Sequence, residues 1–226
     1  MAAILSIETS TSVCSVALHR DGKLVASLEV HLEYSHSSKL AVLVEQVMRL
    51  GEIGMSQLSA IALSAGPGSY TGLRIGTSLA KGLCYALDVP LIAVPTLQVM
   101  ATTVGRNNIE DAFLCPMIDA RRMEVYCQIY DANLVELDPI EAKVITPESF
   151  EAYLNAKPVI FFGNGAAKCK EVLVHKNARF LADINPLAAE LGELARLKFE
   201  SGKVEDLFTF VPMYLKEFFL RKAVEA

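Results

Sequence analysis

The fold of this chain is decided by one stretch, Gly66-Pro67-Gly68-Ser69-Tyr70-Thr71-Gly72-Leu73-Arg74-Ile75-Gly76. An apolar run at 60–64 precedes it, and leucines at helical spacing continue to Leu87, so the order predicts a strand, a tight turn and a helix. The glycines permit positive φ or a close backbone approach, and Ser69 or Thr71 can cap the helix. Free N–H groups at such a helix start can hold an anion or a nucleotide. A capped turn whose glycines serve packing explains the same residues and, on the residues alone, is the favoured interpretation.

Two common phosphate-binding motifs are excluded by the spacing of these glycines. Gly66, Gly68 and Gly72 follow the pattern G-x-G-x-x-x-G, whereas a dinucleotide-binding turn requires G-x-G-x-x-G. A P-loop requires Lys and then Ser or Thr after its last glycine, but Leu73 follows Gly72. The turn is therefore neither a Rossmann fingerprint nor a Walker A loop.

Composition and charge restrict the classes of partner. The 226-residue chain is 52% hydrophobic with a formal net charge of −5, and its positive residues form only short clusters, so it is not expected to bind RNA on its own. No apolar run is long enough to span a membrane, and no leader pattern opens the sequence. Five cysteines without a C-x-x-C pair are typical of reduced core residues, which predicts a cytoplasmic protein.

An internal repeat predicts two related halves, 1–108 and 109–226, that form a duplicated α/β unit. Each half opens with an apolar strand that ends on an acid, Glu8 in the first and Asp119 in the second, and continues with a hairpin and helices. The two acids are expected to face one another across a cleft, where carboxylates can hold a metal–phosphate. In the second half, helices are expected at 148–154, 166–174 and 186–201, interleaved with strands at 159–162 and 179–181.

Several further segments carry a resemblance to a known family. Besides the Gly-rich stretch, they are Ile4 to Thr11, Ala80 to Leu83, Pro95 to Leu97, Asp119 to Tyr126, Gly163 to Ala166 and Pro212 to Leu215. In this order they resemble the TsaB (YeaZ) family over nearly the whole chain. The resemblance implies α/β architecture with duplicated ribonuclease-H-like lobes, as in the actin, Hsp70 and sugar-kinase superfamily, and mixed sheets flanked by helices.

The resemblance also implies a function. TsaB-like chains are non-catalytic partners that bind and sustain the TsaD-like transferase, which forms N6-threonylcarbamoyladenosine on tRNA beside the anticodon. A TsaE-like P-loop ATPase supports turnover, the TsaB-like chain forms a homodimer when alone, and tRNA is bound only through the complex. The alternative is an ATP-dependent small-molecule enzyme of the sugar-kinase superfamily, but 226 residues leave little room for the insertions that build a sugar pocket.

The residues do not predict catalysis by this chain alone. A TsaD-like metal site needs two histidines four apart on a helix, whereas His31 and His36 are five apart and would point to different helix faces, so no metal site is expected. Ser69 is not in a G-x-S-x-G elbow and has no histidine nearby in sequence, so peptidase activity is not expected. No catalytic residue is assigned.

A nucleotide cleft, functional or vestigial, is the remaining small-molecule hypothesis. By resemblance to the superfamily, its candidate residues are Thr9, Thr11, Ser12, Asp119, Gly163 and Gly165. Glu8 departs from the family, which usually has Asp there, and the extra methylene would misplace a tightly fitted metal–phosphate contact. No cofactor of its own is therefore expected, and ATP or ADP is considered only within the complex.

The helix after the Gly-rich turn suggests a protein interface. Gly72, Gly76 and Ala80 recur every four residues and would let another backbone approach, beside a stripe of leucines. Packing on the sheet of its own lobe explains the pattern equally well. The family resemblance favours an interface shared by this helix and the one at 37–50. The interface residues expected on this basis are Leu40, Val44, Val47, Gly72, Ile75, Gly76, Leu79, Ala80 and Leu83.

Overall fold

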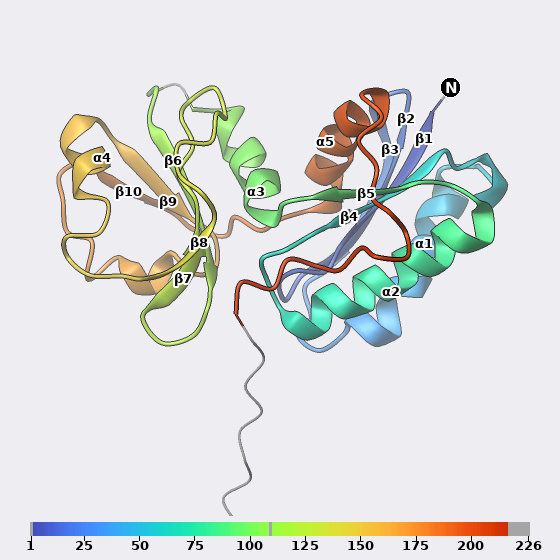
Figure 1. The fold of residues 1–226 in the computed structure, drawn as a ribbon, viewed down its shortest axis with the longest axis horizontal. Coiled ribbons are helices and arrows are strands. Elements are labelled where there is room, and N and C mark those ends of the chain that lie inside the picture. The colour runs from blue at the N-terminus through green and yellow to red at the C-terminus, as the bar shows by residue number, and fades with distance from the viewer. Residues whose placement is uncertain (1, 109, 217–226) are drawn as a thin grey trace, which may run out of the picture.

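The computed structural model describes residues 2–108 and 110–216, which form two lobes with one five-stranded sheet each (Figure 1). The first sheet has the strand order β3-β2-β1-β4-β5. Its strands are β1 (Ala3–Glu8), β2 (Cys14–Arg20), β3 (Lys23–Val30), β4 (Ala60–Ser64) and β5 (Leu91–Val94). Strands β1, β2 and β3 form an antiparallel meander, and β4 and β5 continue the sheet parallel to β1.

The second sheet repeats the first in order and direction, with β8-β7-β6-β9-β10 in the places of β3-β2-β1-β4-β5. Its strands are β6 (Phe113–Asp119), β7 (Glu124–Cys127), β8 (Glu141–Val144), β9 (Val159–Phe162) and β10 (Ala178–Leu181). The pairs β6–β7 and β7–β8 are antiparallel, and β6–β9 and β9–β10 are parallel. The duplication predicted from the sequence is confirmed, and Glu8 and Asp119 occupy equivalent strand ends.

The helices of the two lobes differ more than the sheets do. The first lobe has α1 (His36–Leu50) and α2 (Tyr70–Leu87), whereas the second has only α4 (Glu151–Ala156) and a 3-10 turn at Ala167–Cys169 in the equivalent places. The α-helix expected at 166–174 is wrong, because this segment forms a short 3-10 helix and further tight turns that pack Cys169 and Leu173 into the core of the second lobe. A further short 3-10 helix, Met55–Gln57, precedes β4.

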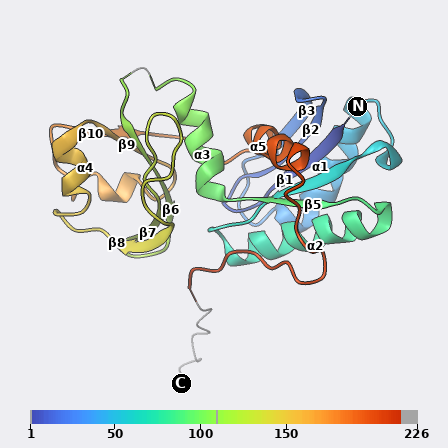
Figure 2. The same cartoon turned by 45° about the horizontal axis from the view of Figure 1, so that its top comes forward.

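The last helix of each half of the sequence packs on the sheet of the other half. Helix α3 (Thr96–Gly105) follows β5 but packs Leu97, Met100 and Val104 into the cluster of Leu114 and Phe162 in the second lobe. Helix α5 (Ala188–Glu200) follows β10 and packs Leu191 and Ala195 against the first sheet. Both views place α3 between the two sheets (Figures 1 and 2). A division at residue 108 therefore separates the strands but not the helices.

The segment 203–216, called here the C-terminal strap, runs back along the first lobe. The Glu205 N–H donates to the Leu91 carbonyl (2.9 Å), and the Lys81 ammonium donates to the carbonyls of Phe208 (3.3 Å) and Phe210 (3.2 Å). The Met213 N–H donates to the Ala65 carbonyl at 2.7 Å, beside the Gly-rich turn. The strap thus joins α5 to the far end of β4 by backbone hydrogen bonds and by the Lys81 ammonium, and its Leu207 and Phe210 pack against the core of the first lobe.

Two predictions from composition concern the described residues. All five cysteines are buried and free of disulfides, as expected of reduced core residues. Within 2–108 and 110–216, no helix has the length and apolarity that a membrane span requires.

Candidate functional site

The Gly-rich turn is packed against the loop between β1 and β2. The Ser69 hydroxyl accepts a hydrogen bond from the Gly72 N–H (3.2 Å) and caps α2, and the Ser69 N–H donates to the Ser10 carbonyl (2.6 Å). A Cβ on Gly68 would lie 2.3 Å from the Ser10 carbonyl oxygen, and one on Gly72 would lie 2.1 Å from that of Thr9. These glycines are therefore required by close packing within the lobe, which is the favoured interpretation reached from the sequence.

The C-terminal strap covers the other side of the turn. Gly66 has φ 104°, and a Cβ there would lie 2.7 Å from the Met213 carbonyl oxygen. The Tyr214 ring lies against the Tyr70 ring with 4.8 Å between centroids. The glycines of the segment that most resembled an anion cradle are thus packed against two parts of the same chain, whereas Ser69 and Thr71 are exposed.

At the end of β1, the Glu8 carboxyl group is fully buried. One oxygen accepts a hydrogen bond from the Ser10 N–H (2.6 Å), and the other has no hydrogen-bond partner among the described residues. Burial raises the pKa of Glu8, and nearby Ser10 and Ser64 oppose that rise. Of the neighbouring nucleotide candidates, Thr9 and Thr11 are buried and only Ser12 is exposed.

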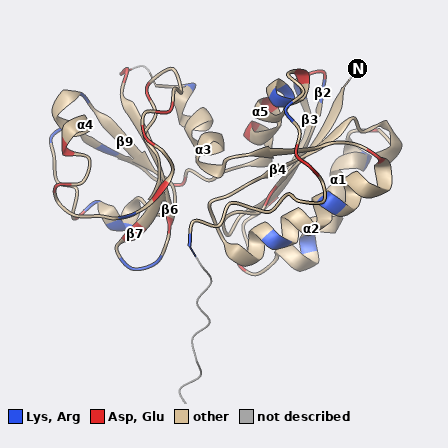
Figure 3. Cartoon of the chain, viewed as in Figure 1, with Lys and Arg blue, Asp and Glu red and all other residues tan. Residues whose placement is uncertain are grey.

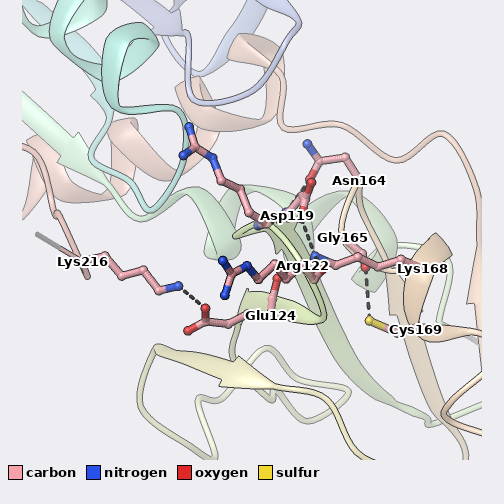
Figure 4. A network of polar contacts seen from close by, with 9 residues as sticks. Asp119, Arg122, Glu124, Asn164, Gly165, Lys168, Cys169 and Lys216 are labelled. Carbon is pink, nitrogen blue, oxygen red and sulfur yellow. Dashed lines mark hydrogen bonds and ion pairs between the residues drawn. The ribbon is translucent and has the colours of Figure 1, made fainter. Parts of the chain in front are cut away.

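At the end of β6, the Asp119 carboxylate is exposed and is paired with the Lys168 ammonium (Figure 4). The Asp119 N–H donates to the Asn164 side-chain oxygen (3.0 Å). A Cβ on Gly163 would lie 2.4 Å from the Met117 carbonyl oxygen, and one on Gly165 would lie 2.8 Å from the Ile118 carbonyl carbon. The predicted adenosine-binding glycines are therefore accounted for by their contact with β6.

The two acids do not form the metal–phosphate site considered from the sequence. Glu8 lies beneath the loop that would have to hold phosphate, and Asp119 already neutralises Lys168. No hydrogen bond or ion pair joins the two side chains in the described parts of the chain. Within the same residues, no group of three His, Cys, Asp or Glu side chains is arranged to hold a metal ion. The residues present do not fit a magnesium nucleotide bound as the superfamily fold implies.

Six of the nine expected interface residues lie inside the first lobe. Leu40, Val44 and Val47 lie in the core of the first lobe, as does Ala80, and Gly72 and Gly76 are buried against Thr9. These six positions are not available to a partner, because their own lobe covers them. Ile75, Leu79 and Leu83 are half-buried and remain candidates. Sequence periodicity had missed the outer face of α2, where Ser78, Gly82 and Tyr85 are exposed.

Neither the serine nor the histidines form a hydrolytic arrangement in the described residues. The Ser69 hydroxyl caps α2, and no hydrogen bond connects it to a histidine. His19 is buried beside Gly192 of α5, and His31 pairs with Glu29 at 3.2 Å.

Comparison with known proteins identifies the family. The family model described as TsaD, tRNA N6-adenosine threonylcarbamoyltransferase, matches residues 31–217. The tRNA threonylcarbamoyladenosine biosynthesis protein TsaB of Bacillus subtilis (strain 168) is 32% identical, over 94% of this chain and 93% of its own length. The chain belongs to the TsaB (YeaZ) family. The resemblance stated from the sequence motifs is confirmed.

Two further similarities locate this TsaB-family chain within its superfamily. The structure of YeaZ from Pseudomonas aeruginosa superposes with a TM-score of 0.80 at 27% identity, covering 95% of this chain and all (100%) of that one. The tRNA N6-adenosine threonylcarbamoyltransferase of Syntrophotalea carbinolica is 31% identical, but over only 42% of this chain and 32% of that protein. The TsaB-family chain therefore matches Bacillus subtilis TsaB over nearly its whole length and this transferase over about a third of its length.

Proposed function

We propose that this chain acts in the biosynthesis of N6-threonylcarbamoyladenosine in tRNA, as a non-catalytic partner that binds and sustains a TsaD-type transferase. The observation that carries the proposal is the similarity to Bacillus subtilis TsaB over 94% of the chain. The site geometry supports the non-catalytic part, because the ends of β1 and β6 are occupied by contacts within the chain. The sugar-kinase alternative is not favoured, since it requires both acids to hold a metal–phosphate.

The first prediction concerns ATP. Because Glu8 is buried and Asp119 is paired with Lys168, the purified chain is expected to release phosphate from ATP no faster than a buffer control. An Asp119→Asn variant purified in parallel reports contaminating ATPases, and it should give the same background rate. Steady turnover in the wild type that disappears in Asp119→Asn would restore the kinase alternative. ATP or ADP is proposed to enter only through the assembled complex.

We propose that the transferase docks on the outer face of α1 and α2, where Ile75, Leu79 and Leu83 border the exposed positions of α2. The chain is 52% hydrophobic, and this face exposes Val42 and Tyr85, so it is a suitable surface to cover. The same face is proposed to pair with a second copy when the transferase is absent. A TsaE-like P-loop ATPase completes the proposed assembly.

The second prediction tests this face at Gly82. A Cβ at Gly82 has no neighbour within 4 Å, so Gly82→Arg should fold normally while placing a long charged side chain on the docking surface. Binding to the transferase is expected to weaken about tenfold, or about 1.4 kcal/mol. The measurements are co-elution with the transferase and formation of threonylcarbamoyladenosine in a reconstituted reaction.

The matched control is Asn133→Arg, which adds the same side chain at an exposed turn of the second lobe. It should assemble and support the reaction as the wild type does. A Gly82→Arg protein that is folded, assembles and sustains the reaction normally would move the docking surface away from α2. Loss of function in both variants would argue against any specific role of this face.

The chain alone is proposed to bind tRNA only weakly, and stable binding of tRNA is proposed to occur only through the complex. The chain has a net charge of −5, so it can make few contacts with phosphate groups. Because the release of counterions by such contacts supplies most of the affinity for RNA, its own affinity for tRNA should be low. The basic residues considered for peripheral contacts are Arg121, Arg122, Lys216, Arg221 and Lys222, of which the last two lie outside the described residues. The five free, buried thiols suit the reducing cytoplasm, where we propose the complex works.

A further inference from the structure

The hairpin that joins β6 to β7 has an unusual tip. Arg121 and Arg122 are consecutive non-glycine residues with positive φ, 72° and 51°, and both side chains are exposed. Non-glycine residues adopt this left-handed region at an energetic cost, so two in succession persist only where surrounding contacts hold them. Such positions are concentrated at functional sites.

Lys168 supplies the contacts that hold the tip (Figure 4). Its ammonium donates to the carbonyl oxygens of Arg122 (2.6 Å) and Glu124 (2.7 Å) and pairs with the Asp119 carboxylate. The Asp119 carboxylate in turn accepts the Arg121 N–H at 2.9 Å. One half-buried ammonium therefore binds both ends of the turn and fixes the backbone from which the two arginines project.

The same contacts leave the two guanidinium groups without a carboxylate. Asp119 is neutralised by Lys168, and Glu124 is neutralised by Lys216 of the C-terminal strap. Neither guanidinium group has a hydrogen bond or ion pair with another residue in 2–108 or 110–216. The hairpin thus presents two uncompensated positive charges on a chain whose net charge is −5.

We propose that Arg121 and Arg122 form a binding site for the phosphate backbone of RNA. A guanidinium group offers a planar fork of N–H donors that matches two phosphate oxygens, and its charge persists at every physiological pH. The choice of RNA over another anion rests on the proposed function. Figure 3 shows further Lys and Arg positions on helix α2 of the first lobe. An acidic protein segment is the competing occupant.

The site can be tested on the isolated chain, because NMR detects weak binding. Titration with an anticodon stem-loop RNA at low salt is expected to shift the amide signals of residues 119–124. The variant Arg121→Ala/Arg122→Ala should bind the RNA about tenfold more weakly, with a salt slope smaller by about 1 to 2. The matched control is Lys176→Ala/Arg179→Ala, which removes two exposed charges at and just before the edge strand β10. It should leave the RNA affinity and the salt slope close to those of the wild type, since it lowers only the overall positive charge.

Two outcomes would overturn the site. One is RNA binding that is equal in the wild type and in Arg121→Ala/Arg122→Ala. The other is a shift of residues 119–124 with hexaglutamate but not with RNA, which would assign the site to an acidic protein. Co-elution of the double variant with the transferase separates this inference from the proposed function. A complex that forms but binds tRNA more weakly supports the site, whereas a wild type that does not bind the transferase counts only against the proposed function.

Discussion

Replacing Gly72 with alanine is expected to lower the free energy of unfolding by about 3 kcal/mol, the upper end of the usual cost of overpacking. The added Cβ would lie 2.1 Å from the Thr9 carbonyl oxygen, a backbone atom that cannot rotate away. The loop between β1 and β2 or the start of α2 must therefore move. Urea unfolding followed by circular dichroism measures the loss.

Two other glycines of α2 provide a graded control in the same helix. Gly82→Ala adds its methyl group in open space and should stabilise the chain by about 0.5 to 1 kcal/mol through helix propensity. Gly76→Ala meets the Thr9 hydroxyl oxygen at 2.3 Å, and because that side chain can rotate, an intermediate loss is expected. Equal stabilities for the Gly72 and Gly82 variants would show that the close packing of the Gly-rich turn is not what requires glycine there.

The first lobe could be predicted from sequence because its signals are local. The strand at 60–64, the tight turn and the helix capped by Ser69 each follow from a few neighbouring residues, and the structure places them where they were expected. The duplication was also accessible, since an apolar strand ending on an acid occurs twice. It predicted two related halves, and the structure shows in addition that the two sheets share one strand order.

The parts that were missed depend on contacts distant in sequence. The apolar residues at 166–174 suggested an α-helix, but this segment instead forms a short 3-10 helix and further tight turns. Nothing in the sequence near α3 or α5 shows that each packs on the sheet of the other lobe. The C-terminal strap has no periodicity, because it is held by backbone hydrogen bonds to Leu91 and Ala65 and by the Lys81 ammonium.

The site was predicted less well than the fold for the same reason. Small residues every four positions indicate a close approach by something, and here that partner is Thr9 of the same lobe. Likewise, Asp119 could be identified as a strand-end acid, but its pairing with Lys168 could not, because the two residues are distant in sequence and meet only in the folded chain. The left-handed arginines at the hairpin tip had no sequence signal beyond their adjacency, since arginine rarely adopts that conformation.

The buried Glu8 gives the chain a pH dependence of known sign. Burial raises its pKa above the ordinary value of 4.5, so the native state holds the carboxyl proton more tightly than the unfolded state does. Its contribution to stability is therefore fully present below pH 4.5 and is lost as the pH rises through the raised native pKa. Above that point, the native state contains a buried carboxylate with one unpaired oxygen.

Glu8→Gln is expected to remove this loss and to raise the free energy of unfolding by about 2 kcal/mol at pH 8, because glutamine has no charge to bury. The amide oxygen can keep the hydrogen bond from the Ser10 N–H, and glutamine stays neutral at every pH. At pH 4 the two proteins should be nearly equal, because Glu8 is then protonated. Urea unfolding at both pH values measures the difference, with Glu45→Gln on the exposed side of α1 as the control that should show none. A Glu8→Gln protein whose stability follows that of the wild type across this range would mean that the buried carboxylate has partners that stabilise its charge.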